Sequence, residues 1–289
     1  MLEALPVMPE LQNLNISNNR FDERSLDIVF GHAVYDKTVY NKLVDLQLWD
    51  VNLGKYENGQ VFDSLLQLLS NESSLIRFYF GNNKLSPSKI NKILSQLSMI
   101  PTLIDLELGS QTLDEECALT LCQFLKQLKY LDLTNCNLAD NYAWMLIAPI
   151  SESENIKQLV LDSNSLSDKF MKEFCSTLKA VGEDDFKYGD KESQFRQTPN
   201  LGMNEEEFTI NASSEDYRTA RSGLSNLGLA NNNFSDHAID YFCDLISSGS
   251  SFVRKLQIVD LSDNNITESG KQKISKALIG RQDLKININ

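Results

Sequence analysis

Residues 128–138 read LKYLDLTNCNL, and the same pattern, L-x-x-L-x-L-x-x-N-x-L, returns along the whole chain of 289 residues. Near-complete copies begin at Leu11, Leu43, Leu75, Leu103, Leu128, Ile156, Leu224 and Leu256, and a shorter ninth copy begins at Arg281. Successive copies start 32, 32, 28, 25, 28, 68, 32 and 25 residues apart. Self-similarity at such a period is the signature of a stacked repeat architecture.

Each part of the pattern predicts a local structure. Leucines two residues apart, such as Leu131 and Leu133, point to one face of a short strand, and the residues between them point to the other face. Helix starts follow the strands, because Ser or Asp there can cap a helix and Pro suits its first turn. The expected starts are Ser86-Pro87, Asp114, Ser167, Ser235 and Thr267. One strand and one helix cannot bury their apolar faces alone, so the units should stack with parallel strands.

A polar position after each strand is expected to hold the turn together. Asparagine occupies it five times, at Asn19, Asn83, Asn164, Asn232 and Asn264, where its amide can satisfy backbone groups. Cys136 takes this position in the fifth repeat, whereas Val51 and Gln111 depart from the pattern in the second and fourth. We therefore expect distorted turns in those two repeats.

The pattern resembles the ribonuclease-inhibitor-like class of leucine-rich repeat proteins, which pair each strand with a full helix. The resemblance covers nearly the whole chain outside residues 181–223 and allows Cys136 at its position. It implies an α/β solenoid, a horseshoe with a parallel β-sheet on the concave face and helices on the convex face. We expect a single domain over residues 1–289, with about eight repeats and a truncated ninth.

Residues 181–223 form an acidic insertion between repeats six and seven. It is polar and lacks the periodicity of the repeats, so we expect residues 183–217 to be mobile and to be cleaved first by proteases. Two interpretations stay open: a tolerated surface excursion, because long loops cost little closure entropy, or a functional lid or docking loop.

Composition narrows the class of partner and the setting. The net charge of −13 and the pI of about 4.7 disfavour nucleic acid, which is bound through Lys and Arg. We expect no membrane span and no secretory signal, and five buried, reduced cysteines in a cytoplasmic protein. The irregular repeats rich in Asn, Lys and Ile are also similar to effectors that bacteria inject into the host cytosol. Neither end shows an obvious cap, so the chain is either minimally capped or part of a larger protein.

No residue pattern indicates catalysis or metal binding. His32 and His237 are far apart and have no partner at ligand spacing, and Cys117 and Cys122 fit a buried helix stripe. We expect no cofactor, no metal and no enzymatic activity.

The open face of the sheet is the predicted binding surface. The residues between the strand leucines should form columns across adjacent repeats, with Gln47, Tyr79, Glu107 and Asp132 in the middle column, and Asp283 and Lys285 opposite Ile258 and Asp260. Trp49 and Tyr79 occupy positions that should face solvent, and aromatic side chains there are typical anchors of interfaces. Gly81 and Gly109 should leave a shallow depression beside Trp49. The predicted partner-binding residues are Trp49, Tyr79, Asp105, Glu107, Tyr130, Asp132 and Asp162. The alternative is that the two aromatic rings pack on each other and the acids are merely solvated.

These residues predict a monomeric, non-enzymatic scaffold for a protein with a basic patch, binding neither nucleic acid nor membrane. One alternative is a GTPase-activating protein of the Ran activator type, since that family shares this repeat class and uses an arginine in an early repeat, where this chain has Arg20. Another is the ligand-sensing domain of a larger receptor.

Overall fold

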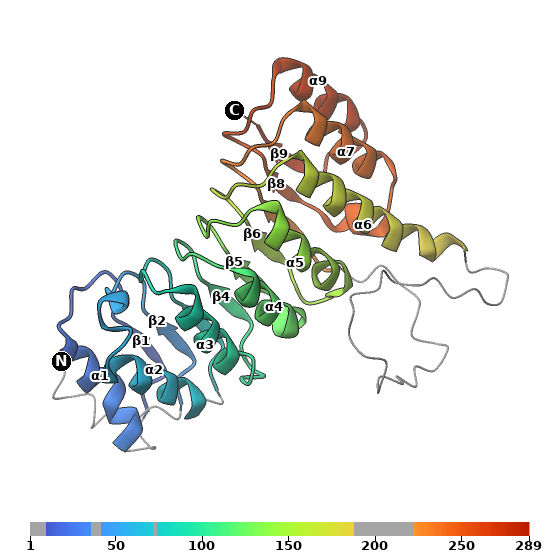
Figure 1. The fold of residues 1–289 in the computed structure, drawn as a ribbon. Coiled ribbons are helices and arrows are strands. Elements are labelled where there is room, and N and C mark those ends of the chain that lie inside the picture. Colours follow the sequence, from blue (N-terminus) through green and yellow to red (C-terminus); the bar gives the residue numbers. More distant parts are fainter. Residues whose placement is uncertain (1–9, 36–41, 72–73, 188–221, 289) are drawn as a thin grey trace, which may run out of the picture.

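The computed structural model describes residues 10–35, 42–71, 74–187 and 222–288, and these form a curved stack of strand and helix units (Figure 1). Nine parallel strands make one sheet in sequence order, and each strand has three residues. They are β1 (Asn13–Asn15), β2 (Asp45–Gln47), β3 (Arg77–Tyr79), β4 (Asp105–Glu107), β5 (Tyr130–Asp132), β6 (Gln158–Val160), β7 (Asn226–Gly228), β8 (Ile258–Asp260) and β9 (Lys285–Asn287).

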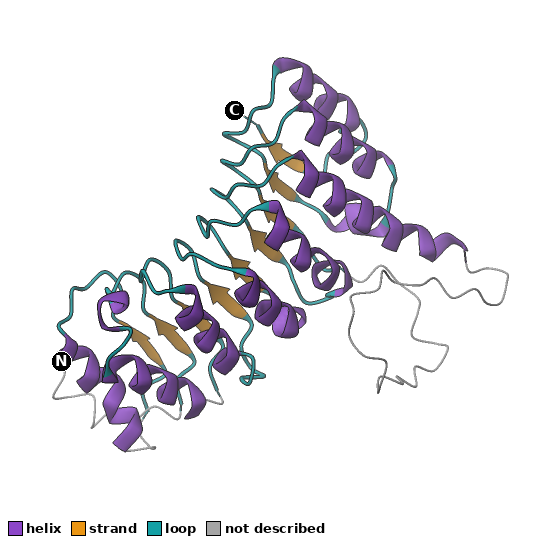
Figure 2. Cartoon of the chain, in the orientation of Figure 1, coloured by secondary structure: helices purple, strands orange, loops and turns teal. Residues whose placement is uncertain are grey.

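Helices cover the opposite side of each unit from the open face of the sheet (Figure 2). The α-helices are α1 (Glu23–Tyr35), α2 (Gln60–Asn71), α3 (Pro87–Leu97), α4 (Glu115–Phe124), α5 (Asp140–Glu152), α6 (Asp168–Lys187), α7 (Asp236–Ser247), α8 (Ser251–Lys255) and α9 (Glu268–Ala277). Two 3₁₀ helices, η2 (Leu53–Tyr56) and η3 (Leu125–Gln127), complete the described elements. The predicted α/β leucine-rich-repeat horseshoe is confirmed.

The core is one layer of side chains between the sheet and the helices. The central residues of neighbouring strands, such as Leu106, Leu131 and Leu159, lie opposite one another and are fully buried. Phe170 and Phe174 of α6 stack with their ring centroids 5.7 Å apart, and Phe252 of α8 meets Phe174 edge to face. Each fully buried side chain of this kind stabilises the fold by about 1.5–3 kcal/mol.

The turn after each strand contains a left-handed residue at the same position in all eight full repeats. One residue in each adopts the left-handed conformation, with φ between 50° and 60°: Asn18, Asp50, Asn82, Ser110, Asn135, Ser163, Asn231 and Asp263. Asp50 and Ser110 belong to the second and fourth repeats, so the prediction of distorted turns there is wrong at the residue that reverses the chain. The turn survives because the neighbouring repeats supply its hydrogen bonds: Asp50 donates its N–H to the carbonyl of Gly81, and Ser110 donates its N–H to that of Thr134.

The asparagines satisfy backbone groups inside the turns, as predicted. Asn164 donates from Nδ2 to the carbonyl oxygens of Leu133 and Leu161, and its Oδ1 accepts the N–H groups of Cys136 and Leu138 at 3.0 and 2.9 Å. One side chain thus fastens two repeats.

Gln111 reproduces only half of this arrangement. Its Nε2 donates to the carbonyl of Phe80 at 2.9 Å, while its buried Oε1 has no hydrogen-bond partner within the described chain.

The ninth repeat corrects the predicted register. The sequence pattern aligned Asp283 with Ile258 and Lys285 with Asp260, but Lys285 pairs with Ile258 and Asn287 with Asp260. The pattern treated Leu284 and Ile286 as the inward pair of the strand. Leu284 is instead buried just before the strand, which moves β9 two residues along.

The stack continues without a break where the insertion was predicted. β6 pairs directly with β7, and α6 extends to Lys187, so it includes the first seven residues of the segment that the sequence assigned to the insertion. Residues 188–221, with most of the expected mobile and protease-sensitive segment, lie outside the described residues.

Candidate functional site

The open face of the sheet carries three columns of side chains, one residue from each repeat in each column. The pairing of β1 to β8 places Gln47, Tyr79, Glu107 and Asp132 side by side in the middle column, as the sequence predicted. Neighbouring strands lie about 4.8 Å apart, so these side chains adjoin one another.

Trp49 lies across two glycines in the column after the strands. A Cβ atom built on Gly81 would lie 1.8 Å from Cζ3 of the Trp49 indole, and one on Gly109 would lie 3.1 Å from its Cη2. The depression predicted at Gly81 and Gly109 is therefore filled by the indole of Trp49. This leaves Trp49 half-buried, with one edge of the ring against the backbone of two repeats.

Tyr79 is also half-buried, one strand away from Trp49. Partial burial raises the pKa of its phenol first, and the negative charges of Asp105, Asp45 and Glu107 raise it further. The phenol therefore stays protonated and can donate a hydrogen bond to an acceptor on a partner.

An arginine that the sequence analysis missed stands among the acids. Arg77 Nε lies 2.9 Å from Oδ2 of Asp45, which is 8% exposed, and Gln47 donates to the other oxygen of Asp45 at 3.1 Å. The alternation Asp45, Arg77, Asp105 along the first column was the signal that could have revealed this pair. Asp45 is thus neutralised from within the protein.

Two further predicted site residues bond to each other. The Tyr130 hydroxyl donates to Oδ2 of Asp132 at 3.1 Å, and Oδ1 of Asp132 accepts the N–H of Thr134 at 2.7 Å. Burial raises the pKa of Tyr130, and the carboxylate of Asp132 raises it further. Asp132 therefore caps its own turn as well as facing the open side.

Asp162 is directed towards the seventh repeat. Its Oδ1 accepts the N–H of Ala230 at 2.8 Å and would lie 2.7 Å from a Cβ on Gly228. Burial raises its pKa, the hydrogen bond from Ala230 lowers it, and Asp260 and Asp132 raise it again. This carboxylate therefore helps to join repeats six and seven.

Asp105 and Glu107 face the open side from the same strand. Burial raises the pKa of both carboxyl groups. Arg77 and Lys129 counter this effect at Asp105, whereas Asp132 raises the pKa of Glu107 further. The open face thus combines aromatic groups with carboxylates, and these carboxylates differ in whether a positive charge of the protein offsets their own.

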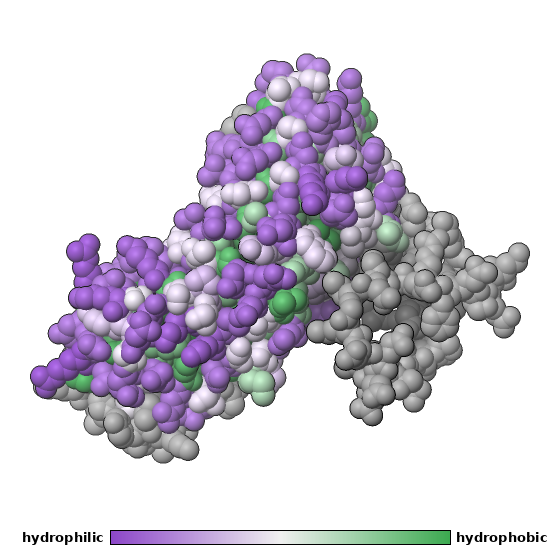
Figure 3. Space-filling view, viewed as in Figure 1, coloured by the Kyte–Doolittle hydropathy of each residue, from purple (hydrophilic) through white to green (hydrophobic). Residues whose placement is uncertain are grey.

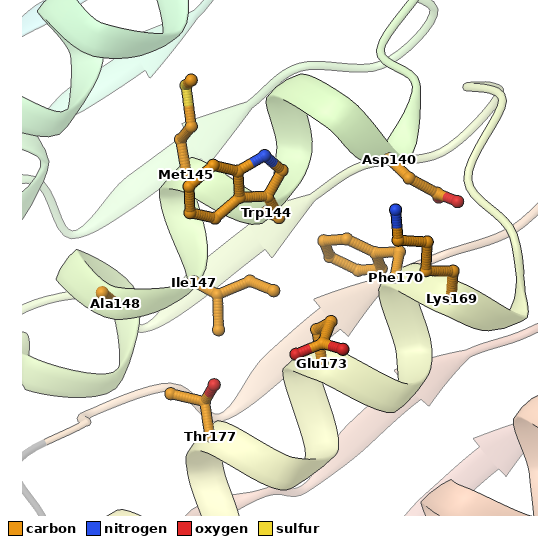
Figure 4. Close-up of a pocket in the computed structure, with 9 residues that line it drawn as sticks. All are labelled: Asp140, Trp144, Met145, Ile147, Ala148, Lys169, Phe170, Glu173 and Thr177. Carbon is orange, nitrogen blue, oxygen red and sulfur yellow. The ribbon is translucent and has the colours of Figure 1, made fainter. Parts of the chain in front are cut away.

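A second surface feature lies on the helical side and was not predicted. A groove of about 380 Å³ runs between α5 and α6, and Trp144, Met145, Phe170, Lys169 and Glu173 are among its lining residues (Figure 4). Trp144 is 49% exposed. The face with the helices is mainly hydrophilic, with a small hydrophobic area over its α4 and α5 part (Figure 3).

Among the described residues, no three His, Cys, Asp or Glu side chains are placed to hold a metal ion, and no helix is long and apolar enough to cross a membrane. All five cysteines are free. Cys117, Cys136 and Cys175 are buried, but Cys122 and Cys243 are only half-buried, which corrects the expectation that every thiol is buried.

Three curated relatives match the chain at 25–28% identity. NACHT, LRR and PYD domains-containing protein 3 matches at 25% over 81% of this chain in Macaca mulatta and at 28% over 40% of it in Homo sapiens. NACHT, LRR and PYD domains-containing protein 5 of Mus musculus matches at 27% over 67%. These matches cover 22%, 14% and 16% of the relatives' own lengths, so the chain spans about a fifth or less of them.

Two solved structures whose backbones align with this chain share 14% sequence identity with it. An internalin from Listeria monocytogenes aligns over all of this chain and 70% of its own, with a TM-score of 0.48. A leucine-rich repeat protein from Leptospira interrogans aligns over 98% of this chain and 62% of its own, with a TM-score of 0.41.

No family model matches the sequence. Two observations assign the chain to a repeat family. Eight full copies of one pattern each form a strand, a turn with one left-handed residue and a helical return. The names of the relatives include the leucine-rich repeat. The chain is a leucine-rich repeat protein.

Proposed function

We propose that this protein is a non-catalytic scaffold that binds a basic segment of another protein on the open face of repeats two to five. The observation that carries the proposal is the position of Trp49, whose indole rests on Gly81 and Gly109 while part of it stays exposed. An aromatic group held this way loses little freedom on binding, and such groups are typical anchors of interfaces.

Charge complements this anchor. Glu107, Asp132 and Asp105 surround the aromatic groups, and burial raises the pKa of Glu107 and Asp105, so their ionised forms are costly in the free protein. A cationic partner group would relieve that cost. Charge attraction of this kind raises the association rate and makes binding sensitive to salt. Nucleic acid does not fit, because its phosphates would meet carboxylates.

The two alternatives carry different consequences. A GTPase activator of the Ran type would use Arg20, which is exposed after β1, and purified protein would accelerate GTP hydrolysis by a small GTPase. A ligand-sensing unit of a larger receptor would bind its ligand on the same face, since the relatives carry further kinds of domain by name. We further propose that the domain acts as a monomer in the cytoplasm, or in a host cytosol if it is an effector.

Trp49 itself can report the test. The chain contains two tryptophans, and Trp144 lies on α5, so Trp144→Phe leaves Trp49 as the sole tryptophan, whose emission can be excited selectively. Peptides selected from a random phage-displayed library on this variant are expected to be rich in Lys and Arg and to change the emission of Trp49. They should bind Trp49→Ala and Tyr79→Ala at least tenfold more weakly. Selected peptides that bind these two variants like the parent protein would refute the proposal.

A further inference from the structure

The carboxylates of the open face differ in their internal partners. Asp45 pairs with Arg77, Asp132 accepts from Tyr130 and Thr134, and Asp162 accepts from Ala230. Asp105 has Arg77 and Lys129 as compensating charges.

Glu107 has none of these. Within the described part of the chain, no hydrogen bond or ion pair joins its half-buried carboxylate to another residue, and Asp132 repels it. A half-buried charge without a partner is costly, and a structural role would not require it.

Aromatic groups surround this carboxylate. Glu107 pairs in register with Tyr79 on one side and Asp132 on the other, and its charge acts on the phenols of both Tyr79 and Tyr130. The indole of Trp49 reaches Gly109, which is two residues beyond Glu107 on the same face. That spacing corresponds to about 6.6 Å along an extended chain.

We propose that Glu107 and Trp49 together bind one arginine side chain of the protein partner, with its guanidinium against the indole and paired to the carboxylate. This inference rests on the proposed function and names the group that the site recognises. A guanidinium is planar, so it can stack on an indole while its N–H groups pair with a carboxylate in the plane.

Charge complementarity supports an arginine in particular. The same face already holds one pair of this chemistry, since Arg77 Nε of β3 lies 2.9 Å from Oδ2 of Asp45 of β2, and β3 pairs with the strand that carries Glu107. A lysine ammonium is a compact, strongly hydrated charge, which gains less from lying on a flat ring. A lysine should therefore bind the same place more weakly.

The test uses small peptides on the full chain that carries Trp144→Phe. The probes are acetyl-Gly-Gly-Arg-Gly-Gly-amide and the same peptide with lysine or citrulline in place of arginine, and the signal is the NMR resonance of the Trp49 Nε1–H. The arginine peptide should shift this resonance saturably, the lysine peptide should need at least threefold more for half-saturation, and the neutral citrulline peptide should give no saturable shift.

Two matched variants assign the effect to one carboxylate. Glu107→Gln should weaken arginine binding at least fivefold. Asp260→Asn makes the same chemical change in the same column, four strands away, and keeps an acceptor for the N–H of Ser262, so it should change binding less than twofold. Melting temperatures of both variants show that they remain folded.

Three results would overturn the arginine site. These are no saturable shift with the arginine peptide at 20 mM, equal binding of the citrulline peptide, or unchanged binding by Glu107→Gln. The scaffold proposal would survive each of them if library-selected peptides still required Trp49 and Tyr79, and it would fail separately if they did not.

Discussion

The indole of Trp49 occupies the space above Gly81 where any other residue would place its side chain, because a Cβ on Gly81 would lie 1.8 Å from Cζ3 of the ring. An aromatic group of the second repeat is thus accommodated by the absence of a side chain in the third. This relationship makes the position of the ring testable independently of any partner.

Gly81→Ala should displace the indole. The expected cost is about 1–3 kcal/mol of unfolding free energy, the usual range for overpacking, together with a red shift of Trp49 emission in the Trp144→Phe background. Gly109→Ala should cost less, since its Cβ would lie 3.1 Å from the ring. A double-mutant cycle with Trp49→Ala checks the cause. Gly81→Ala should become nearly neutral in that background, and an equal cost in both backgrounds would show that the ring does not lie there.

Asn164→Ala should destabilise the protein by about 3 kcal/mol or more. The change leaves the buried N–H groups of Cys136 and Leu138 and the carbonyl of Leu133 without their partner, and each unsatisfied buried group costs about 1–3 kcal/mol. Asn19→Ala is the control, because Asn19 is exposed and bonds only within its own repeat. Equal losses in urea unfolding would contradict the role of Asn164 as a link between repeats.

Most of the fold could be predicted because the pattern is repeated. Eight copies placed the strands, the helix starts at Asp114, Ser235 and Thr267, and the columns of the open face. The ninth copy is incomplete, and without its following leucines the pattern could not show that Leu284 precedes the strand. Gln111 misled the prediction of its turn, because the missing asparagine is a local feature. Backbone hydrogen bonds from the neighbouring repeat preserve the turn without it.

For the candidate site, the sequence predicted which residues lie next to one another on the open face, but not how their side chains are oriented. Register places residues opposite one another, but it does not say which way a long side chain turns. The sequence therefore left the space over Gly81 empty, whereas Trp49 lies in it. It also grouped the carboxylates together, although that of Asp162 bonds to Ala230 and that of Glu107 bonds to no described residue. The groove beside Trp144 was missed because it lies between two helices that no single repeat defines.

Glu107→Gln should not lower stability at neutral pH and is expected to raise it slightly. Burial and Asp132 raise the pKa of Glu107 above its ordinary 4.5, so the folded state binds this proton more tightly than the unfolded state does. Wild-type stability should then fall as the pH rises through the folded pKa, and the variant lacks this loss. The two proteins should converge below about pH 4, where the carboxyl group is protonated in both states. A clear destabilisation at pH 7 would instead indicate a structural role.

The cysteines should react slowly in the native protein. Burial raises the pKa of Cys117 and Cys136 to about 12 and that of Cys122 and Cys243 to about 11, and burial likewise raises that of Cys175, so the reactive thiolate is scarce at pH 8. Reaction with iodoacetamide, followed by mass spectrometry, should begin at the half-buried Cys122 and Cys243. Rapid labelling of Cys136 without denaturant would show that the turn of the fifth repeat opens.

Asp132→Asn should mainly flatten the salt dependence of partner binding. An asparagine can still accept the N–H of Thr134 at Oδ1, as Asn15 does for Ser17 in the first repeat, so the turn should stay intact while one charge is lost. Surface charges at the edge of an interface act chiefly on association rate and its dependence on ionic strength.

The affinity of the Trp49→Ala variant for a library-selected basic peptide tests the proposed binding face most directly. Loss of an aromatic anchor usually costs more than about 2 kcal/mol, so binding should weaken roughly thirtyfold while the melting curve stays cooperative. Lys172→Ala on the exposed side of α6 should bind like the unmodified protein. If Trp49→Ala binds with unchanged affinity and Trp144→Ala in the groove between α5 and α6 abolishes binding, the partner sits on the helices and the proposed face is wrong.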